Sequence, residues 1–291
     1  MMTTNAESVH RQAVVNGVRL HYVEAGDGPL IVLLHGFPEF WYSWRHQIGA
    51  LAAAGFRVIA PDMRGYNLSA KPRGVHAYRL EALTADVAGL IRHAGAGRAT
   101  VVGHDWGGLV AWQVPIHHPD VVESLIILNA PHPGPARREM RTLAQLRKSW
   151  YIFFFQLPDL PEWSIRRREF AGIAKVFRTE PLRPGAFTAE DVRLYQEALA
   201  RPGALTAALN YYRALFRRSW REWSKPIPPI TVPTLVIWGE RDPYLGLPLL
   251  EGLQEWVPDL RVERVPDASH WIQVDAPEKV NRLMIEFLRN H

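Results

Sequence analysis

The chain has 291 residues, of which 47% are hydrophobic, so it is long enough for one well-cored globular domain that carries an insertion. It contains no cysteine, which excludes a disulfide framework, a thiolate nucleophile and a cysteine metal site. The formal net charge is +5, and the excess comes from residues 132–225, where 18 Lys and Arg stand against 9 Asp and Glu.

Arginines spread along helical faces are ordinarily a solvated surface, so we expect no nucleic-acid partner. The N-terminal stretch is polar, and the longest apolar run, residues 150–155, is far shorter than the roughly 18 to 20 residues of a membrane span. We therefore expect no membrane span and a cytoplasmic location. Monomer and homodimer both remain open.

The first predicted elements are two extended runs, residues 13–15 and 18–23, on either side of Asn16 and Gly17. An Asn-Gly pair between two extended runs is typical of a tight β-hairpin. The chain is therefore expected to open with antiparallel strands.

The next runs, residues 30–34 and 56–60, are continuously apolar, as in strands that are covered on both faces. Residues 44–54 between them have the apolar spacing of a helix, and a helix between two such strands implies a parallel crossover. The alternation continues with a helix at 80–93 and strands at 100–103 and 122–128. This order predicts an α/β fold with a mostly parallel, doubly wound sheet.

The strand pattern stops at Asn129 and resumes near residue 234, so residues 132–225 are predicted to be an inserted helical cap. The core is then residues 1–131 and 226–291, with further strands at 234–238 and 261–265 and a terminal helix at 277–288. We expect the first helix of the insert to contain Tyr151. Most aromatic side chains of the insert are expected to form the core of the insert itself. The aromatic residues of the insert include Trp150, Tyr151, Phe153, Phe154, Phe155, Phe170, Tyr211, Tyr212, Phe216, Trp220 and Trp223.

The most informative stretch is Gly103-His104-Asp105-Trp106-Gly107, at a predicted strand-to-helix turn. This spacing is that of a nucleophile elbow, in which flanking glycines let one side chain stand clear of the sheet. Most elbows carry Ser at the centre, whereas this one carries Asp105. A carboxylate can displace a leaving group at a saturated carbon and become an ester itself, so the predicted nucleophile is Asp105.

Two further polar residues, Asp242 and His270, come directly after predicted strands. Together with Asp105 they follow the nucleophile, acid, base order of a hydrolase built on such a sheet. His270 is the predicted base, and Asp242 would orient its imidazole. Asp267 is a rival acid, although it lies on the same loop as His270 and suits a turn position.

An oxyanion hole needs backbone N–H donors from the residue after the nucleophile and from the loop after an early strand. These positions are Trp106 and Phe37. We also expect a cis peptide bond before Pro38, since such bonds occur in tight turns of this kind.

These motifs resemble those of epoxide hydrolases of the α/β-hydrolase fold, over nearly the whole chain. The motifs that carry the resemblance are His35-Gly36-Phe37-Pro38-Glu39, Arg64-Gly65-Tyr66, Gly103-His104-Asp105-Trp106-Gly107-Gly108, Asn129-Ala130-Pro131-His132, Gly239-Glu240-Arg241-Asp242 and Ser269-His270-Trp271. The resemblance implies two cap tyrosines that bind the epoxide oxygen, and the matching positions are Tyr151 and Tyr212. Two departures from the family pattern are Asn67, in place of a small glycine, and Pro115, which should kink the helix after the nucleophile.

The resemblance implies a two-step hydrolysis of a small apolar epoxide to a vicinal diol, through a covalent ester of Asp105 that water then hydrolyses. It implies no metal or organic cofactor, and its only reaction partners are the epoxide and water. The residues expected to contact substrate are Tyr151, Tyr212, Trp106, Phe37 and Pro38.

The nearest alternative is a haloalkane dehalogenase, which uses the same Asp, His and acid but must bind a halide. The Trp106 indole could donate to a halide, whereas Phe37 offers no side-chain donor. A fluoroacetate-type dehalogenase would need an arginine near the elbow, and a serine esterase is excluded by Asp105. A catalytically idle receptor of the same fold is a further alternative, against which the complete set of site residues argues.

Overall fold

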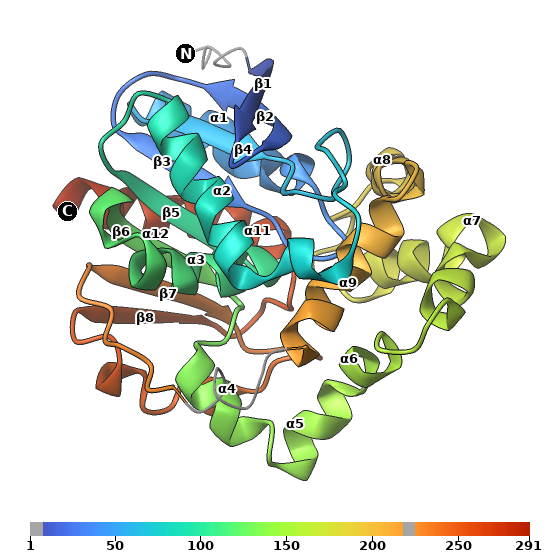
Figure 1. Cartoon of the computed structure of the whole chain (residues 1–291). Coiled ribbons are helices and arrows are strands. Elements are labelled where there is room, and N and C mark those ends of the chain that lie inside the picture. The colour runs from blue at the N-terminus through green and yellow to red at the C-terminus, as the bar shows by residue number, and fades with distance from the viewer. Residues whose placement is uncertain (1–7, 218–224) are drawn as a thin grey trace.

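The structure is a computed structural model that describes residues 8–217 and 225–291, so Trp220 and Trp223 lie outside the described residues. Its centre is one eight-stranded sheet with the strand order β1-β2-β4-β3-β5-β6-β7-β8 (Figure 1). The strands are β1 (Val9–Val15), β2 (Val18–Ala25), β3 (Leu30–Leu34), β4 (Arg57–Pro61), β5 (Ala99–His104), β6 (Val122–Leu128), β7 (Thr234–Gly239) and β8 (Leu260–Val265).

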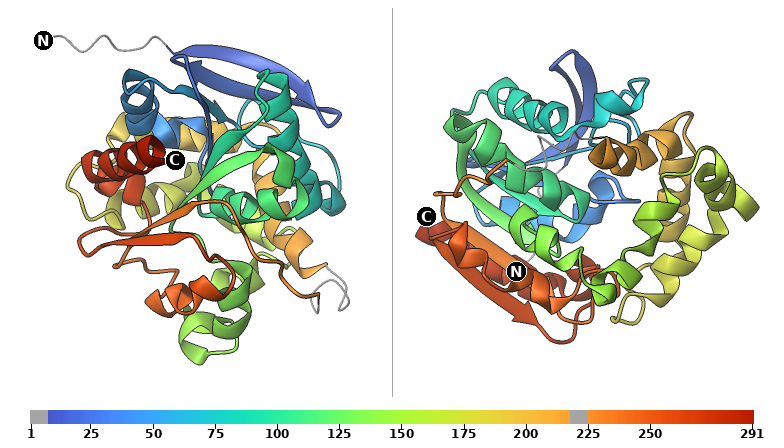
Figure 2. Two further views of the ribbon diagram at one scale, coloured as in Figure 1. Left: turned by 90° about the vertical axis from the view of Figure 1, so that its left-hand side faces the viewer. Right: turned by 60° about the horizontal axis from the view of Figure 1, so that its bottom comes forward.

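The sheet is parallel from β4 to β8, and only β1 and β2 run antiparallel to their neighbours. The predicted mostly parallel, doubly wound sheet is therefore confirmed. The β1–β2 hairpin lies at one edge of the sheet (Figure 2). Its turn residues Asn16 and Gly17 have φ angles of 50° and 70°, as the tight hairpin predicted from this pair requires.

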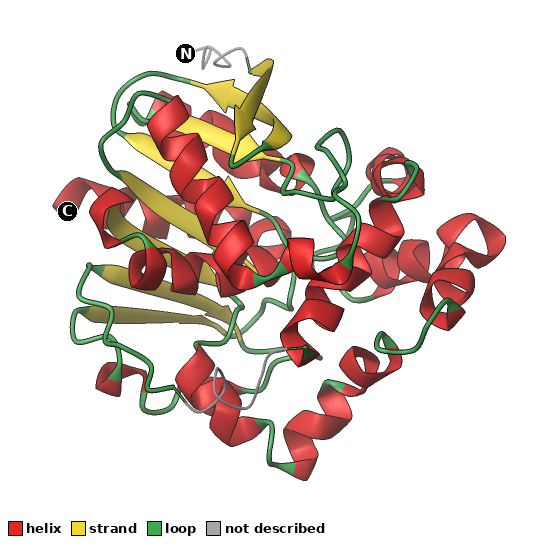
Figure 3. Cartoon of the chain, viewed as in Figure 1, coloured by secondary structure: helices red, strands yellow, loops and turns green. Residues whose placement is uncertain are grey.

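Helices cover both faces of the sheet, so β5 is buried along its whole length (Figure 3). Val101 faces one apolar core, which is closed by α2 and α3, and Val102 faces another, which is closed by α1, α11 and α12. The helices of this core region are α1 (Arg45–Ala53), α2 (Leu80–His93), α3 (Trp106–His117), α11 (Ile272–Asp275) and α12 (Pro277–Asn290). Short 3₁₀ helices are η1 (Trp41–Trp44), η2 (Val75–Tyr78), η3 (Pro119–Val121), η4 (Leu247–Leu250) and η5 (Leu253–Glu255).

The described residues between β6 and β7 contain helices and no strand, and they lie beyond the end of the sheet toward which the parallel strands point (Figure 1). The sequence placed Tyr151 on the first of these helices, but two helices precede it because Thr142 caps a separate helix, α5, through its hydroxyl. The inserted helices are α4 (Pro133–Glu139), α5 (Leu143–Lys148), α6 (Trp150–Phe154), α7 (Leu160–Thr179), α8 (Ala189–Ala200) and α9 (Ala204–Phe216).

The aromatic residues of the insert divide between interior and surface. Phe170 and Tyr211 are buried as expected, but Trp150, Phe153 and Phe216 are 63%, 44% and 43% exposed. Trp150 and Phe153 belong to the short helix α6, none of whose residues is fully buried, and Phe216 is the last residue of α9. Within the described ranges, the structure contains no helix with the length and apolar character needed to cross a membrane.

Two departures from the family pattern are accommodated locally. Asn67 has a φ angle of 36°, in the left-handed region that asparagine tolerates better than most residues. Pro115 lies in the last turn of α3, where the loss of one backbone N–H affects little of the helix.

Candidate active site

Asp105 occupies the turn between β5 and α3, with a φ angle of 50° and a ψ angle of −119°. A positive φ is unfavourable for a residue with a side chain, so close packing must hold this turn. A Cβ atom at Gly103 would lie 2.3 Å from the Gly107 carbonyl oxygen, and one at Gly107 would lie 2.1 Å from the Leu34 carbonyl oxygen. Only glycine allows these approaches, which present the Asp105 carboxylate at the carboxyl end of the sheet.

His270 follows β8 and lies beside Asp105, with 3.6 Å between its Nε2 and Asp105 Oδ2. Its other ring nitrogen, Nδ1, is 2.7 Å from Asp242 Oδ2. Asp242 follows β7 and also accepts hydrogen bonds from the backbone N–H groups of Tyr244, at 2.7 Å, and Leu245, at 2.9 Å. The structure thus brings together three side chains from three different strand ends.

Burial raises the pKa of the Asp105 carboxyl, but the hydrogen bond and positive charge of His270 outweigh burial and hold this pKa below its usual value. The same opposed effects hold the pKa of Asp242 below its usual value. Burial lowers the pKa of the His270 imidazole, and the two carboxylates raise it well above its usual value. At neutral pH the free site therefore holds an imidazolium between two carboxylates.

The Phe37 backbone N–H donates a hydrogen bond of 2.8 Å to Asp105 Oδ1. The Phe37–Pro38 peptide bond is cis, as predicted, and Pro38 is buried beside the site loop. Trp106 is the first residue of α3, so its N–H is one of the donors that a helix N-terminus leaves without a helical partner. Both expected N–H donors therefore flank the carboxylate.

Two tyrosines from different inserted helices lie over the carboxylate. The ring of Tyr212, on α9, makes T-shaped contacts with Trp106, at 4.9 Å between centroids, and with Phe37, at 5.5 Å. The ring of Tyr151, on α6, contacts that of Tyr212 at 6.0 Å. Burial, followed by the negative charge of Asp105, raises the pKa of both hydroxyls well above its usual value, so both keep their protons at neutral pH.

The chain is similar to known proteins along most of its length. The α/β hydrolase fold family matches residues 29–277. The AB hydrolase superfamily protein YfhM of Bacillus subtilis is 48% identical over 94% of this chain and 96% of that protein. Epoxide hydrolase 3 of Xenopus tropicalis is 39% identical over 94% of this chain and 76% of that protein.

Solved structures agree with the sequence relatives. The crystal structure of Bacillus megaterium epoxide hydrolase in complex with an inhibitor has a TM-score of 0.87 and 35% identity, covering 96% of this chain and 100% of that chain. The chain belongs to the epoxide hydrolases of the α/β-hydrolase fold. The fold and the family predicted from the sequence motifs are therefore confirmed.

In this epoxide hydrolase, Asp267 lies away from the site. Its side chain is 87% exposed, and it forms an ion pair of 3.2 Å with Arg241 at the surface. Of the two candidate acids, only Asp242 contacts the imidazole of His270.

Asn129 holds Asp242 in place, a role that the sequence did not reveal. Its Nδ2 donates 2.7 Å to Asp242 Oδ2, and its Oδ1 accepts 2.8 Å from the Gly239 N–H. With a φ angle of 37°, Asn129 turns sharply at the end of β6. Its position directly after a buried strand, in the motif Asn129-Ala130-Pro131-His132, is the sequence signal for such a role.

A second buried network holds the backbone of His270 in this epoxide hydrolase. Glu39 Oε2 is 2.8 Å from His104 Nδ1, and His104 Nε2 is 2.8 Å from the His270 carbonyl oxygen. The Gln273 amide donates 3.2 Å to Glu39 Oε1. Because His104 precedes Asp105, this network joins the turn at Asp105 to the loop that carries His270. Glu39 and His104 lie in motifs that carry the family resemblance, but no sequence pattern indicates this structural role.

Proposed function

We propose that this epoxide hydrolase converts an apolar epoxide to a vicinal diol through a covalent ester of Asp105. The observation that supports the proposal best is the position of two protonated tyrosines, Tyr151 and Tyr212, over a carboxylate that also lies beside His270. A carboxylate nucleophile, a base and two neutral acids around one point are what two-step epoxide hydrolysis needs.

In the first step, an oxygen of Asp105 attacks an epoxide carbon and the bond from that carbon to the ring oxygen breaks. The ring oxygen takes a proton from Tyr151 or Tyr212, because an alkoxide is a poor leaving group without an acid. The products are a hydroxyalkyl ester of Asp105 and a phenolate. Since a phenolate is a strong base, it then takes the proton of the His270 imidazolium.

Ester formation itself prepares His270 for the second step. It removes the charge of Asp105, one of the two carboxylates that raise the pKa of His270, so the imidazole gives up its proton more easily. Neutral His270 can then act as a base, while Asp242 continues to orient its ring.

In the second step, His270 takes a proton from water as the oxygen of that water adds to the ester carbonyl carbon. The N–H groups of Phe37 and Trp106 stabilise the oxyanion. When the intermediate collapses, the bond from the carbonyl carbon to the diol oxygen breaks. The departing alkoxide takes the proton of the new Asp105 carboxylic acid. The diol leaves, and Asp105 and His270 are again charged.

We also propose that residues 132–225 act as a cap over a core formed by residues 1–131 and 226–291. The contact of Tyr212 with Trp106 supports this division, because it places an inserted side chain against the nucleophile turn. Aromatic rings surround the carboxylate, which favours an apolar substrate.

The test is diol formation from a panel of aryl and alkyl epoxides, measured beside halide release from haloalkanes. We expect diol from epoxides and little halide, because Phe37 has no side-chain donor to accompany the Trp106 indole. Halide release without diol formation would contradict the proposal and favour the dehalogenase alternative.

A further inference from the structure

Tyr244 contacts both His270 and its partner acid, although no sequence motif marks it for this role. Its backbone N–H donates a hydrogen bond of 2.7 Å to Asp242 Oδ1. Its ring packs edge-on against the His270 imidazole at 5.3 Å between centroids and against Tyr151 at 5.5 Å. The Tyr244 ring is therefore one wall of the space in which the imidazole can turn.

Glu180, at the end of α7, holds the other end of this tyrosine. The Tyr244 hydroxyl donates a hydrogen bond of 2.6 Å to Glu180 Oε1. The indole N–H of Trp271 is buried near Glu180 and favours its ionised form. The Trp271 ring contacts the imidazole of His270 at 5.2 Å. Glu180 is thus linked to one of the two aromatic residues that flank the imidazole and lies near the other.

The chain after Glu180 is tied to the His270 loop a second time. The backbone N–H groups of Leu182 and Arg183 donate to Asp275 Oδ1, at 2.8 Å and 3.1 Å. Asp275 Oδ2 accepts 2.8 Å from the backbone N–H of Ser269, the residue before His270. The end of α7 is therefore anchored to the loop that carries His270 and to the loop that carries Asp242.

We propose that Glu180 is a positioning residue for ester hydrolysis: by holding the Tyr244 hydroxyl, it keeps the His270 imidazole aligned with Asp242 when the end of α7 is seated. This inference rests on the proposed function. Ring opening depends less on Glu180, because Tyr212 is held by Trp106 and Phe37 on the other side of the carboxylate.

The charge of Glu180 should also affect the pH dependence of ester hydrolysis. The titratable groups that face Glu180 are Tyr244, His270, Asp242 and Tyr151. Burial raises the pKa of the Glu180 carboxyl, while Tyr244, Trp271 and His270 favour its ionised form. An ionised Glu180 stabilises the imidazolium, so its removal lowers the pKa of His270. Ester hydrolysis needs neutral His270, so its rate falls as the pH drops through the pKa of His270. When this pKa is lower, the acid limb of the pH–rate profile moves to lower pH.

The experiment is single-turnover kinetics at several pH values, with ester formation and ester decay followed by intact-protein mass. Glu180→Leu removes both the acceptor of the Tyr244 hydroxyl and the charge. For this variant we expect ester formation within about twofold of wild type, ester decay slower by about tenfold, and the acid limb of the pH profile of ester decay at lower pH. Glu169→Leu removes an exposed carboxylate at the kink inside α7 and serves as the matched control, with no change expected. Thermal unfolding of each variant reports on folding.

Tyr244→Phe removes the same hydrogen bond but keeps the ring and the charge of Glu180. We expect slow ester decay without the shift of the limb to lower pH. The double variant should decay no more slowly than the slower single variant, because both changes remove one bond.

Normal ester decay in Glu180→Leu would overturn the inference. So would equal slowing of both steps together with a lowered unfolding temperature, which would indicate a purely structural role. Additive losses in the double variant would also contradict it. If wild type forms diol and ester while Glu180→Leu behaves normally, only this inference fails. If no ester forms in any variant, the proposed function fails as well.

Discussion

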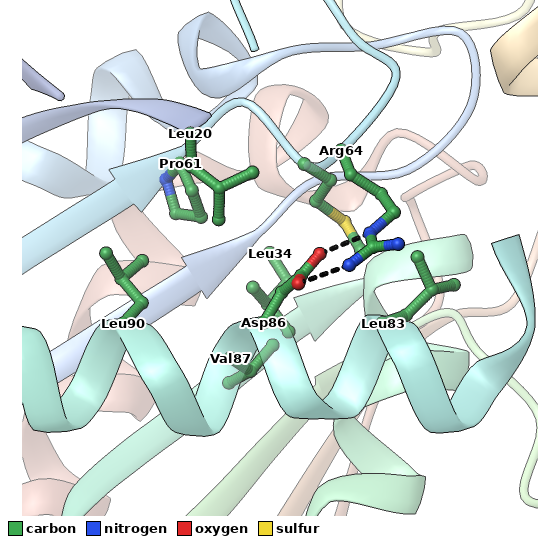
Figure 4. A pocket seen from close by; sticks show the side chains of 9 residues that line it. Leu20, Leu34, Pro61, Arg64, Leu83, Asp86, Val87 and Leu90 are labelled. Atoms are coloured by element: carbon green, nitrogen blue, oxygen red, sulfur yellow. Dashed lines mark hydrogen bonds and ion pairs between the residues drawn. The ribbon is translucent and has the colours of Figure 1, made fainter. Parts of the chain in front are cut away.

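The Tyr211 hydroxyl donates a hydrogen bond of 2.7 Å to the backbone carbonyl of Arg64, and this bond joins α9 to the core next to Tyr212. The Arg64 guanidinium is buried and contacts both carboxylate oxygens of Asp86, on α2, at 2.5 Å each (Figure 4). It also donates 2.7 Å to the Ala77 carbonyl oxygen. Because Arg64 is fixed in this way, it gives α9 a rigid point of attachment.

Replacing Tyr211 with Phe should therefore weaken the attachment of α9. The buried Arg64 carbonyl loses a partner, which should lower the free energy of unfolding by about 1 to 3 kcal/mol. Ring opening should also slow, because Tyr212 follows Tyr211 in the helix. Urea denaturation and the rate of ester formation measure the two effects.

The matched control is Tyr195→Phe. Tyr195 is as fully buried as Tyr211, and its hydroxyl bonds to the Ser43 hydroxyl in a different cluster. This variant should lose stability without slower ring opening. Equal rates of ester formation in both variants would show that Tyr211 does not position Tyr212.

The covalent intermediate should accumulate in a His270→Gln variant, because the imidazole acts as a base only in ester hydrolysis. Intact-protein mass should rise by one substrate mass on exposure to an epoxide. Asp105→Ala should abolish the rise. A folded His270→Gln protein that binds the epoxide but stays unmodified would favour direct attack by water.

Asp242→Asn should slow ester hydrolysis by about 10²- to 10⁴-fold and ring opening much less, because Asp242 orients and stabilises the imidazolium of the second step. Pre-steady-state kinetics should show the ester accumulating. Asp267→Asn changes an exposed side chain and is the matched control. A larger defect in the Asp267 variant would show that Asp267, and not Asp242, is the acid that supports His270.

Tyr151→Phe or Tyr212→Phe alone should cost about 2 to 4 kcal/mol of transition-state stabilisation, by analogy with the loss of one oxyanion-hole donor. One hydroxyl can still donate to the epoxide oxygen in each single variant. The double variant should lose more than the sum, because the pair acts on one oxygen. The measurement is kcat/KM for diol formation, and retained turnover in the folded double variant would contradict the proposed mechanism.

His132 should make the protein less stable in mild acid. It is buried between Trp112 and Trp256, and burial, with a smaller effect from Arg137, lowers its pKa to about 4. In the unfolded chain the His132 imidazole has a pKa near 6.5, so between this pH and the lower folded-state value the unfolded state binds a proton that the folded state does not bind. Stability should therefore fall as the pH drops from about 6.5 to about 4, by roughly 2 to 4 kcal/mol in all.

Urea denaturation across this pH range tests the prediction. His132→Gln should flatten the dependence on pH, even if the variant is less stable at neutral pH. His93→Gln changes an exposed histidine and should keep the wild-type dependence. An unchanged dependence in the His132 variant would contradict the prediction.

The sheet and the tight turn at Asp105 were predictable from the sequence, because both depend on local patterns. Continuous apolar runs identified the strands that are buried on both faces, such as β3 and β5. The glycines around Asp105 were informative, because a Cβ atom at Gly103 or Gly107 would lie 2.3 Å or less from a backbone oxygen. No residue with a side chain fits at these positions. The order of Asp105, Asp242 and His270 followed, since the carboxyl ends of parallel strands share one edge.

The sequence favoured Asp242 over Asp267, and the packing of the loops showed that only Asp242 contacts the imidazole of His270. Only the tertiary structure revealed the bond between Tyr244 and Glu180, which are 64 residues apart and on different elements. It also showed which aromatic side chains of the insert are exposed, Trp150 among them. Such contacts depend on how whole helices are placed against one another. The apolar spacing along the chain specifies which face of a helix is buried, but it does not specify which residues of other elements that face contacts.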